Sequence, residues 1–362
     1  MKTSLNIRIE KRLAASKTNN IIIRVLFTIL SFPFIGIWFA IYGVNPLDAY
    51  IKIFIGGFGS SYGLSETIVK MLPIGLCAVG LAIAYKARVL NIGAEGQLIM
   101  GSITTTWVAL YSNVPPGLAV SVMLLAGFIA GAAWAIIPAL LKTKLGVNEV
   151  IVTLMMNYIS LSILNYVVTG PWRGEAQWGF PQTDLFPSYA RLPTLAGTRI
   201  HYHTLAILLA STILLYILIY KTTIGYEIKL VGNNPDAARY AGISLSKTIL
   251  LVMVLSGGLA GIAGVGEVAG IQGRLIRGIS PGYGYTAIIP AWLGGLDPLA
   301  TLAASFFISG LMVGGDNIQV SLRLPSGLVY LFNGTILLFV ISGEFLTRYK
   351  VVLQVGERRI WI

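Results

Sequence analysis

The polar stretch KTTIGYEIKLVGNNPDAARYAGISLSK at residues 221–247 runs directly into the apolar stretch TILLVMVLSGGLAGIAGVGEVAG at residues 248–270. The apolar stretch is long enough to cross a lipid bilayer as a helix. The polar stretch is the long interruption in a second half that is otherwise almost continuously apolar. This alternation predicts a membrane protein in which polar segments connect helical spans.

The composition of the whole chain supports the same class. Hydrophobic residues make up 56% of the 362 residues and charged residues only 11%, whereas soluble domains carry about 25% charged residues. The net charge of +12 comes from basic residues at the ends of apolar segments. They do not form a patch on a soluble surface, so no nucleic-acid partner is expected. The fold class is therefore an all-α polytopic membrane protein.

Apolar runs along the chain predict about ten transmembrane helices. The eighth is short and contains Pro290, which predicts a broken or re-entrant segment. The corresponding domain organisation is a cytosolic basic segment at 1–22, a transmembrane domain at 23–345 and a cytosolic tail at 346–362. The predicted spans are 23–43, 66–84, 96–112, 118–141, 148–169, 203–220, 248–270, 284–295, 299–315 and 327–345.

The distribution of positive charge predicts the orientation of these spans. If the N-terminus is inside, most of the 26 lysine and arginine residues fall on inner segments, as the positive-inside rule requires. Both termini and the loop at 221–247 are then cytosolic.

A short helix is predicted within this loop, roughly from Pro235 to Ala241. Asn234 suits the N-cap position, Pro235 suits the first turn, and Asp236 complements the positive end of the helix. Gly242 suits the stop. Two turns are too few for stability in water, so this helix should rest against something. A short capped helix on the basic side is what a transporter offers to a soluble motor subunit.

Polar residues within the spans are functional candidates, because burying them in a bilayer is costly. In the fifth span, Glu149, Thr153, Asn157 and Ser160 recur at helical spacing and share one face. Asn157 suits either lining of a substrate path or a hydrogen bond between helices. Glu149, near the inner surface, suits an ion pair or a helix start.

A second polar group, LNIGAEGQLIMG at residues 90–101, opens the third span. Asn91, Glu95 and Gln97 alternate there with glycines that permit sharp turns or close approach. Two interpretations stay open: an irregular segment that penetrates the bilayer, or an ordinary cytosolic turn with Glu95 in the first turn of a helix.

The seventh span carries small residues at Gly257, Gly261 and Gly264, which predict close helix packing. Glu267 shares a face with Ser256 and is a candidate for contacts with the path or with a partner near the outer end.

The following segment, SPGYGYTAIIPAWLGGLDP at residues 280–298, brings Tyr283, Tyr285 and Trp292 beside the proline-broken span. Their rings suit either stacking on a flat substrate or ordinary packing. The candidate path residues are Asn91, Glu95, Gln97, Asn157, Glu267, Tyr285 and Trp292.

No motif for metal binding or nucleotide binding is recognised. His201 and His203 form a pair without a further cysteine or histidine nearby to complete a site. GISLSKT at residues 242–248 lacks the glycine that a phosphate-binding loop requires before its lysine. We therefore expect no catalytic residue, no metal and no ATP site in this chain. Cys77 is the single cysteine.

Several motifs resemble a known family. YEIKLVGNNPDAARYAGISLSK at 226–247, followed by SGGLAGIAGV at 256–265, resembles the permeases of bacterial ABC importers of the simple-sugar and nucleoside class. LNIGAEGQLIMG, LGVNEVIVTLMMNYI at 145–159 and LGGLDPLAT at 293–301 look most like the nucleoside branch, which depends on basic membrane proteins. The resemblance extends over about residues 66–345.

The resemblance implies a multi-subunit assembly in a bacterial plasma (inner) membrane. Its other parts are a second permease subunit, as a heterodimer or homodimer, two cytosolic ATP-binding subunits that hold ATP and Mg, and an external substrate-binding lipoprotein. It also implies a coupling helix with its flanks, formed by Gly232, Asn234, Pro235, Asp236, Ala237, Arg239, Tyr240 and Gly242.

The leading hypothesis is thus a permease subunit that translocates nucleosides and is powered by partner ATPases. A sugar permease of the ribose or galactose type is the alternative on substrate. A proton-coupled carrier that uses Glu95, Glu149 or Glu267 is a further alternative. An intramembrane enzyme would need a convergent set of acid, base or metal residues, which the scattered carboxylates do not provide.

Overall fold

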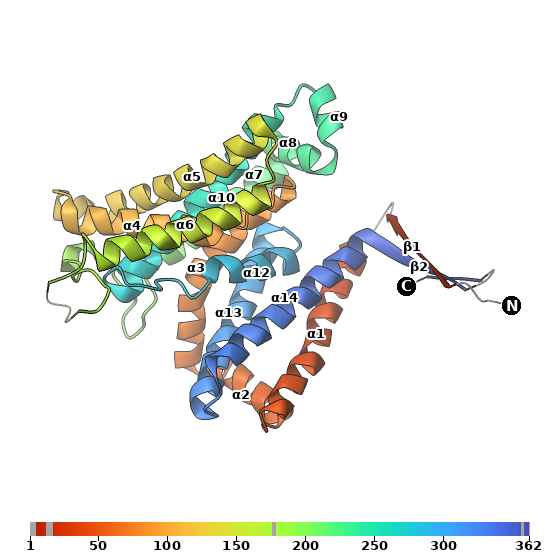
Figure 1. Ribbon diagram of the computed structural model, residues 1–362, viewed down its shortest axis with the longest axis horizontal. Coiled ribbons are helices and arrows are strands. Elements are labelled where there is room, and N and C mark those ends of the chain that lie inside the picture. Colours follow the sequence, from red (N-terminus) through yellow and green to blue (C-terminus); the bar gives the residue numbers. More distant parts are fainter. Residues whose placement is uncertain (1–4, 12–16, 176–178, 356–357, 362) are drawn as a thin grey trace. The chain divides into compact units, whose positions relative to one another are not determined.

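The computed structural model describes residues 5–11, 17–175, 179–355 and 358–361 (Figure 1). Parts of the predicted terminal segments, at 1–4, 12–16, 356–357 and 362, lie outside the described residues. The chain divides into two compact units, one formed by Met1–Ile53 with Gly315–Ile362 and the other by Phe54–Gly314. The fold is that of an all-α polytopic membrane protein, with three short strands near the chain ends.

The unit Phe54–Gly314 is a helical bundle. Its helices are α3 (Ser61–Lys86), α4 (Ala94–Tyr111), α5 (Ala119–Leu145), α6 (Glu149–Thr169), α7 (Tyr202–Lys221), α8 (Thr223–Asn233), α9 (Pro235–Tyr240), α10 (Leu245–Val265), α11 (Tyr283–Thr286) and α12 (Ile288–Leu293). Its connections contain two 3₁₀ turns, at Pro116–Leu118 and Ser188–Ala190. A π-helical turn, η3 (Gly266–Gln272), directly follows α10.

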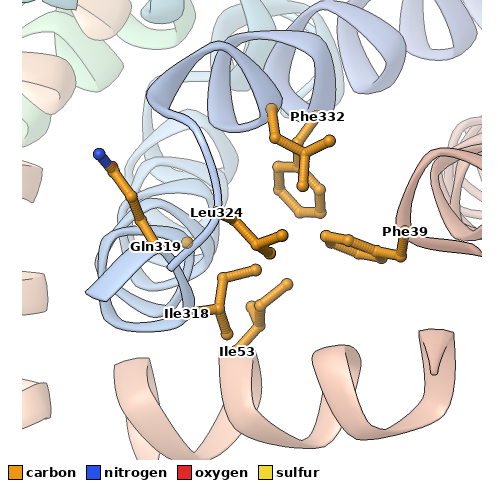
Figure 2. A pocket seen from close by; sticks show the side chains of 8 residues that line it. Phe39, Ile53, Ile318, Gln319, Leu324 and Phe332 are labelled. Atoms are coloured by element: carbon orange, nitrogen blue, oxygen red, sulfur yellow. The ribbon is translucent and has the colours of Figure 1, made fainter. Parts of the chain in front are cut away.

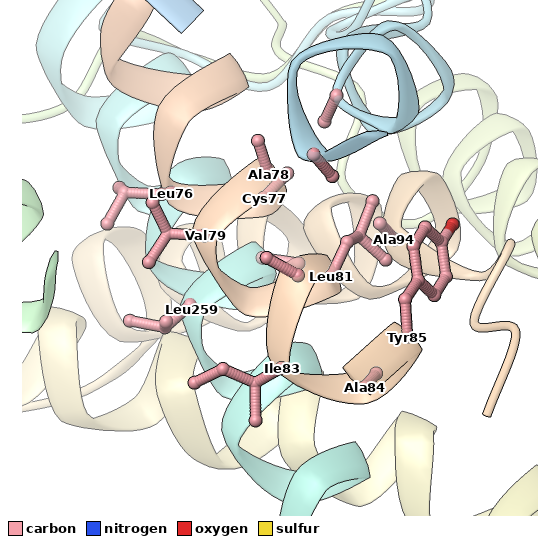
Figure 3. Packing of buried hydrophobic residues seen from close by; sticks show 14 of the residues in the cluster. Leu76, Cys77, Ala78, Val79, Leu81, Ile83, Ala84, Tyr85, Ala94 and Leu259 are labelled. Carbon is pink, nitrogen blue, oxygen red and sulfur yellow. The ribbon is translucent and has the colours of Figure 1, made fainter. Parts of the chain in front are cut away.

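Helix α3 forms the centre of this bundle, and its middle turns are fully buried. Figure 3 shows the side chains from Leu76 to Tyr85 packed against Ala94 of α4 and Leu259 of α10. Because the middle turns of α3 are apolar on every side, they are suited to burial on every side.

Close packing between α10 and its neighbours depends on glycine, as predicted for Gly257, Gly261 and Gly264. A methyl group at Gly261 would collide with the carbonyl oxygen of Gly127 on α5, and one at Gly264 would collide with that of Leu98 on α4. Such contacts let the helix backbones approach each other directly.

Eight helices are long and apolar enough to span a membrane, fewer than the ten predicted, within the part of the chain that the structure describes. The predicted span 96–112 is the helix α4, whose first turns carry Glu95 and Gln97 and which lies within the bundle. The predicted span 284–295 is divided into α11 and α12, as its proline suggested.

The unit formed by Met1–Ile53 and Gly315–Ile362 is built around α1 (Lys17–Ile41) and α14 (Ser326–Arg348), which lie side by side in Figure 1. Arg24 of α1 pairs with Glu344 of α14 at 2.9 Å. An antiparallel sheet joins β1 (Leu5–Lys11), β2 (Tyr349–Val355) and β3 (Arg358–Trp361) in that order. The chain passes between the two units within α2 (Pro46–Phe58) and α13 (Pro298–Ser321).

The apolar core of this unit is closely filled. Phe39, Ile53, Ile318 and Phe332 converge on a void of about 10 Å³, while the amide of Gln319 extends away from it (Figure 2). A void of this size is too small for a substrate, and larger hollows lie on the helical bundle.

Candidate functional site

Asn91 and Gln97 form a hydrogen-bonded pair inside the bundle. The Asn91 amide nitrogen donates to Gln97 and to the Ser256 hydroxyl of α10, both at 3.0 Å. In return, the Gln97 amide nitrogen donates to the Asn91 oxygen, also at 3.0 Å. Both side chains are almost completely buried. Their hydrogen-bonding groups are thus engaged with protein, which favours a structural role.

The segment between α3 and α4 is an irregular stretch inside the protein. Residues 87–93 form no helix, and Asn91 within them is fully buried. Asn157 lies about 12 Å along α6 from Glu149, at 1.5 Å per residue, and its oxygen accepts from the Gly96 backbone N–H at 2.9 Å. Helix α4 therefore begins deep in the bundle. The segment is thus irregular and buried in protein, while Glu95 lies in the first turn of α4 as the second interpretation expected. Penetration of the bilayer stays a prediction.

The predicted polar face of α6 packs against this segment. The amide nitrogen of Asn157 donates to the carbonyl of Ile92 and to the Tyr285 hydroxyl, both at 2.9 Å. Glu149 pairs with Lys142 at 2.5 Å and lies in the first turn of α6, which confirms its predicted role. The stripe is buried, so it connects α6 to the start of α4.

Glu95 lies where the first turns of α4 and α11 meet. Its carboxylate accepts from the Gly284 backbone N–H at 2.8 Å. A carboxylate in this position complements the positive ends of two helices. A methyl group at Gly284 would collide with the Glu95 backbone, so the two helix ends are in direct contact.

The aromatic residues after the π-helical turn have separate surroundings. Trp292 stacks on Tyr85, with ring centroids 5.3 Å apart, and this pair packs within the core. Tyr283 is buried, whereas Tyr285 is half-buried and its hydroxyl interacts electrostatically with Tyr158 of α6. Tyr285 therefore connects the buried polar cluster to the outer face of α6.

The outer face of α6 is open along its length. Tyr158 and Tyr166 are 59% and 68% exposed, and with Ile159, Ser162 and Ile163 they line a shallow, open hollow of about 420 Å³. Sequence reasoning missed this face because the tyrosines lie in an apolar span. Their recurrence with Ser162 at intervals of four residues was the available signal.

The opposite end of the bundle from α9 carries Glu267 and His201. Glu267 is buried in the π-helical turn and interacts electrostatically with Arg199 and Lys70. Arg199 itself pairs with Glu66 at 3.1 Å. His201 is fully buried and fills the space beside Gly270. Burial lowers the pKa of the His201 imidazole to about 4.

The short helix α9 has the predicted capping. Asn234 accepts from the backbone N–H groups of Asp236 and Ala237, both at 3.1 Å, and Pro235 occupies the first turn. Gly242 follows the helix with a φ of +76°. The helix buries only Ala238, and Tyr240 is 94% exposed. Figure 1 shows α9 beyond the end of α8, at the edge of the bundle.

Two features of this region were not predicted. Residues Thr223–Asn233 form the separate helix α8, which starts at the Thr222 cap. A hollow of about 480 Å³ lies beside α9 and is lined in part by Arg88, Lys142 and Arg239. The bundle therefore offers a basic recess next to an exposed helix.

The comparisons with known proteins agree on the class. The sequence profile of a family described as branched-chain amino acid transport system / permease component matches residues 63–341. The chain is 36% identical to a glucose ABC transporter permease of Haloferax volcanii, with 89% of this chain and 87% of that protein aligned.

Two further relatives are named as nucleoside permeases. A guanosine ABC transporter permease of Bacillus subtilis is 33% identical, with 83% of this chain and 87% of that protein covered. A nucleoside ABC transporter permease of Lactococcus lactis is 31% identical, with 90% and 92% covered. The chain therefore belongs to the branched-chain amino acid transport system permease component family, and it is a multi-pass permease subunit of the ABC importers for simple sugars and nucleosides.

Proposed function

We propose that this permease subunit imports nucleosides, together with a second permease subunit. An external binding lipoprotein delivers the substrate, and two separate ATP-binding subunits in the cytosol, which hold ATP and Mg, supply the energy. The chain lies in the plasma membrane with both termini and α9 on the cytosolic side. ATP binding moves α9, and the bundle changes between outward and inward access.

The observation that carries the proposal is the exposed helix α9. Its six residues bury only Ala238, which is too little apolar contact to stabilise so short a helix in water. Asp236 and Arg239 pair at 3.2 Å on its exposed side. Two of the three basic side chains in the neighbouring recess, Lys142 and Arg239, are already paired with carboxylates, so Arg88 is the one that suits an acidic side chain of an ATP-binding subunit. A capped helix beside a charged recess is a suitable docking element for a soluble partner.

The nucleoside assignment is supported by two named relatives and by the open face of α6. Tyr158 and Tyr166 provide aromatic rings and hydroxyl groups at the hollow, and the Tyr285 hydroxyl interacts electrostatically with Tyr158. Nucleobases stack on aromatic rings, and a nucleoside is neutral, so a path with few charges suits it. We place the path along this face, where a second permease subunit would enclose it.

Sugar import is the second candidate, because the relative at 36% identity is named as a glucose permease. Aromatic rings and hydroxyl groups also suit a sugar, so the two candidates share the same face of α6. The two substrates differ in shape, because a nucleoside has a flat nucleobase that can stack on an aromatic ring and a sugar has none.

The test is uptake into proteoliposomes that contain both permease subunits, the ATP-binding subunits and the binding lipoprotein. We expect ATP-dependent uptake of labelled guanosine, with competition by unlabelled nucleosides and none by glucose. Glucose uptake without nucleoside uptake would support the second candidate. Uptake driven by a proton gradient without ATP would contradict both.

Two substitutions test the docking role of α9. Arg239→Glu and Tyr240→Ala should reduce copurification of the ATP-binding subunits and uptake together. Tyr189→Ala is the matched control, because Tyr189 is 42% exposed on the 170–201 connection. Unchanged association and uptake in the Arg239 and Tyr240 variants would exclude α9 as the docking element.

A further inference from the structure

The ends of α3 and α7 meet the turn between α12 and α13 on the α9 side of the bundle. Lys86 lies at the end of α3, Tyr220 lies near the end of α7, and Leu296 and Asp297 form the turn. We call these four residues the latch. None of the four was predicted from the sequence to have a role.

Lys86 joins the end of α3 to the other two elements. Its ammonium group donates to the Tyr220 hydroxyl at 3.2 Å and to the carbonyl of Leu296 at 3.1 Å. It also lies 4.9 Å from the centre of the Tyr220 ring. Hydrogen bonds from a charged donor are stronger than those between neutral groups.

Tyr220 and Asp297 complete the connection. The Tyr220 hydroxyl interacts electrostatically with the Asp297 carboxylate. Asp297 in turn accepts from the backbone N–H groups of Leu299 and Ala300 at 3.1 and 3.0 Å, so it caps α13. One hydroxyl thus lies between a lysine that ends α3 and a carboxylate that begins α13.

The turn itself adopts an unfavourable backbone conformation. Leu296 has a φ of +61°, a region that residues other than glycine rarely enter. Such a residue persists only where its surroundings hold it in place. Lys86, bound to the Leu296 carbonyl, is a group that can do this.

The latch is in contact with the segment that carries α9. A methyl group at Gly232 of α8 would collide with the Lys86 carbonyl oxygen, so α8 packs directly on the end of α3. Lys229 of α8 lies 5.4 Å from the centre of the Tyr220 ring. Movement of α9 and α8 would therefore act on Lys86 and Tyr220.

The other side of the latch leads to the open face of α6. Tyr85, next to Lys86, stacks on Trp292 of α12. Helix α11 precedes α12 and carries Tyr285, whose hydroxyl accepts a hydrogen bond from Asn157 and interacts electrostatically with Tyr158. A displacement of the turn would thus move the aromatic groups of the proposed path.

We propose that Lys86, Tyr220 and Asp297 are positioning residues that couple α8 and α9 to the α11–α12 segment during transport. This inference rests on the proposed function of α9. It assigns to Tyr220 the central place, because its hydroxyl is the group shared by the other two side chains. Loss of that hydroxyl should uncouple ATP hydrolysis from uptake without removing the docking helix.

The experiment compares Tyr220→Phe, Lys86→Met and the double variant in the complete transporter. The readout is substrate taken up per ATP hydrolysed, with copurification of the ATP-binding subunits and melting temperature measured in parallel. We expect each single variant to lower uptake per ATP by roughly fivefold or more, the usual lower range for coupling between sites. The double variant should be no worse than the more severe single variant, because both act on one network.

Matched variants separate coupling from folding. Tyr226→Phe on the exposed side of α8 and Lys144→Met at the end of α5 should leave the ratio unchanged. Asp297→Asn retains a residue that caps helices well but loses the carboxylate, so it should lower the ratio with little change in melting temperature. A lower melting temperature with an unchanged ratio in the Tyr220 and Lys86 variants would overturn the proposal.

The two proposals fail in different ways. If the wild-type complex does not bind the ATP-binding subunits or imports without ATP, the proposed function is wrong. If the wild-type complex works and all three latch variants retain its ratio of uptake to hydrolysis, only the latch is wrong.

Discussion

At the scale of single residues, the buried polar side chains of the bundle are held by neighbouring groups. The side chains of Asn91 and Gln97 hydrogen-bond to each other, and Asn157 accepts from the backbone of α4. Glu95 accepts from the backbone at the start of α11. Buried polar groups cost little when paired and much when a partner is removed. These residues are therefore expected to matter for folding at least as much as for transport.

Asn157 provides a direct measure of this role. Asn157→Leu would leave the Gly96 N–H and the Ile92 carbonyl without their side-chain partner, so we expect a loss of about 1–3 kcal/mol per unpaired group. The melting temperature of the purified protein checks this. Asn165→Leu on the same helix is the control, because the Asn165 side-chain oxygen has no partner among the described residues, and it should be close to neutral.

His201 predicts a pH dependence of stability. Burial lowers its pKa to about 4 from 6.5, so between these values the unfolded chain binds a proton that the folded chain excludes. Stability should therefore be retained above pH 6.5 and lost as the pH falls towards 4, by about 3 kcal/mol from this residue. His201→Gln should show a shallower fall of melting temperature over that range. An identical fall in both proteins would contradict the assignment.

At the scale of elements, helix contacts without side chains determine the packing of the bundle. Gly261 of α10 lies between Gly127 and Gly131 of α5, where even a methyl group has no space. Helices α10 and α5 can therefore rotate or slide against each other only if their backbones first separate.

Gly261→Ala should destabilise the protein by about 1–3 kcal/mol, the usual cost of overpacking. Gly334→Ala in α14 is the control, since nothing lies within 4 Å of the added methyl group. Alanine favours a helix more than glycine does, so this control should be neutral or slightly stabilising. Thermal unfolding of both variants decides the point.

The N-cap of α9 predicts a separable effect on docking. Asn234→Ala removes the acceptor for two backbone N–H groups and should cost the helix about 0.5–2 kcal/mol. The global melting temperature should change little, while association with the ATP-binding subunits weakens. Asn233→Ala, at an exposed neighbouring position, should leave that association unchanged.

At the scale of the whole molecule, the fold class and the boundaries of most spans could be predicted from apolar runs. The capping residues also located α9 closely, because capping depends only on local sequence. The periodicity of α6 placed Asn157 and its neighbours on one face. It gave no information on which helix that face contacts, since contact depends on the other elements.

The remaining differences have physical causes. Helix α4 was predicted to be a transmembrane span, but it carries Glu95 and Gln97 and is surrounded by protein. Its apolar residues therefore pack against other helices, and their number does not show whether the helix spans the membrane. Helix α8 mixes polar and apolar residues over 11 positions and resembles a loop in sequence. The contact of Lys86 with Leu296 joins residues 210 positions apart, which no local pattern reveals.

The orientation of the chain is testable with cysteine labelling. Cys77 is buried, so Cys77→Ala supplies a background without cysteine. In that background, Tyr240→Cys should react with a membrane-impermeant maleimide only after the cells are opened, and Tyr189→Cys should react in intact cells. The reverse pattern would invert the proposed topology and remove α9 from the cytosol.

Asn234 serves two helices at once. Its backbone N–H binds Leu230 of α8 at 2.9 Å, while its side chain and carbonyl belong to α9. Rotation about the bond between its nitrogen and Cα moves α9 together with its capping hydrogen bonds. The same rotation leaves α8 and its hydrogen bond to the Asn234 N–H unchanged. The φ of −150° lies near one limit of a broad permitted range, so this dihedral angle can change without strain. Helix α9 can therefore rotate as a rigid body about Asn234 without losing a hydrogen bond at that residue.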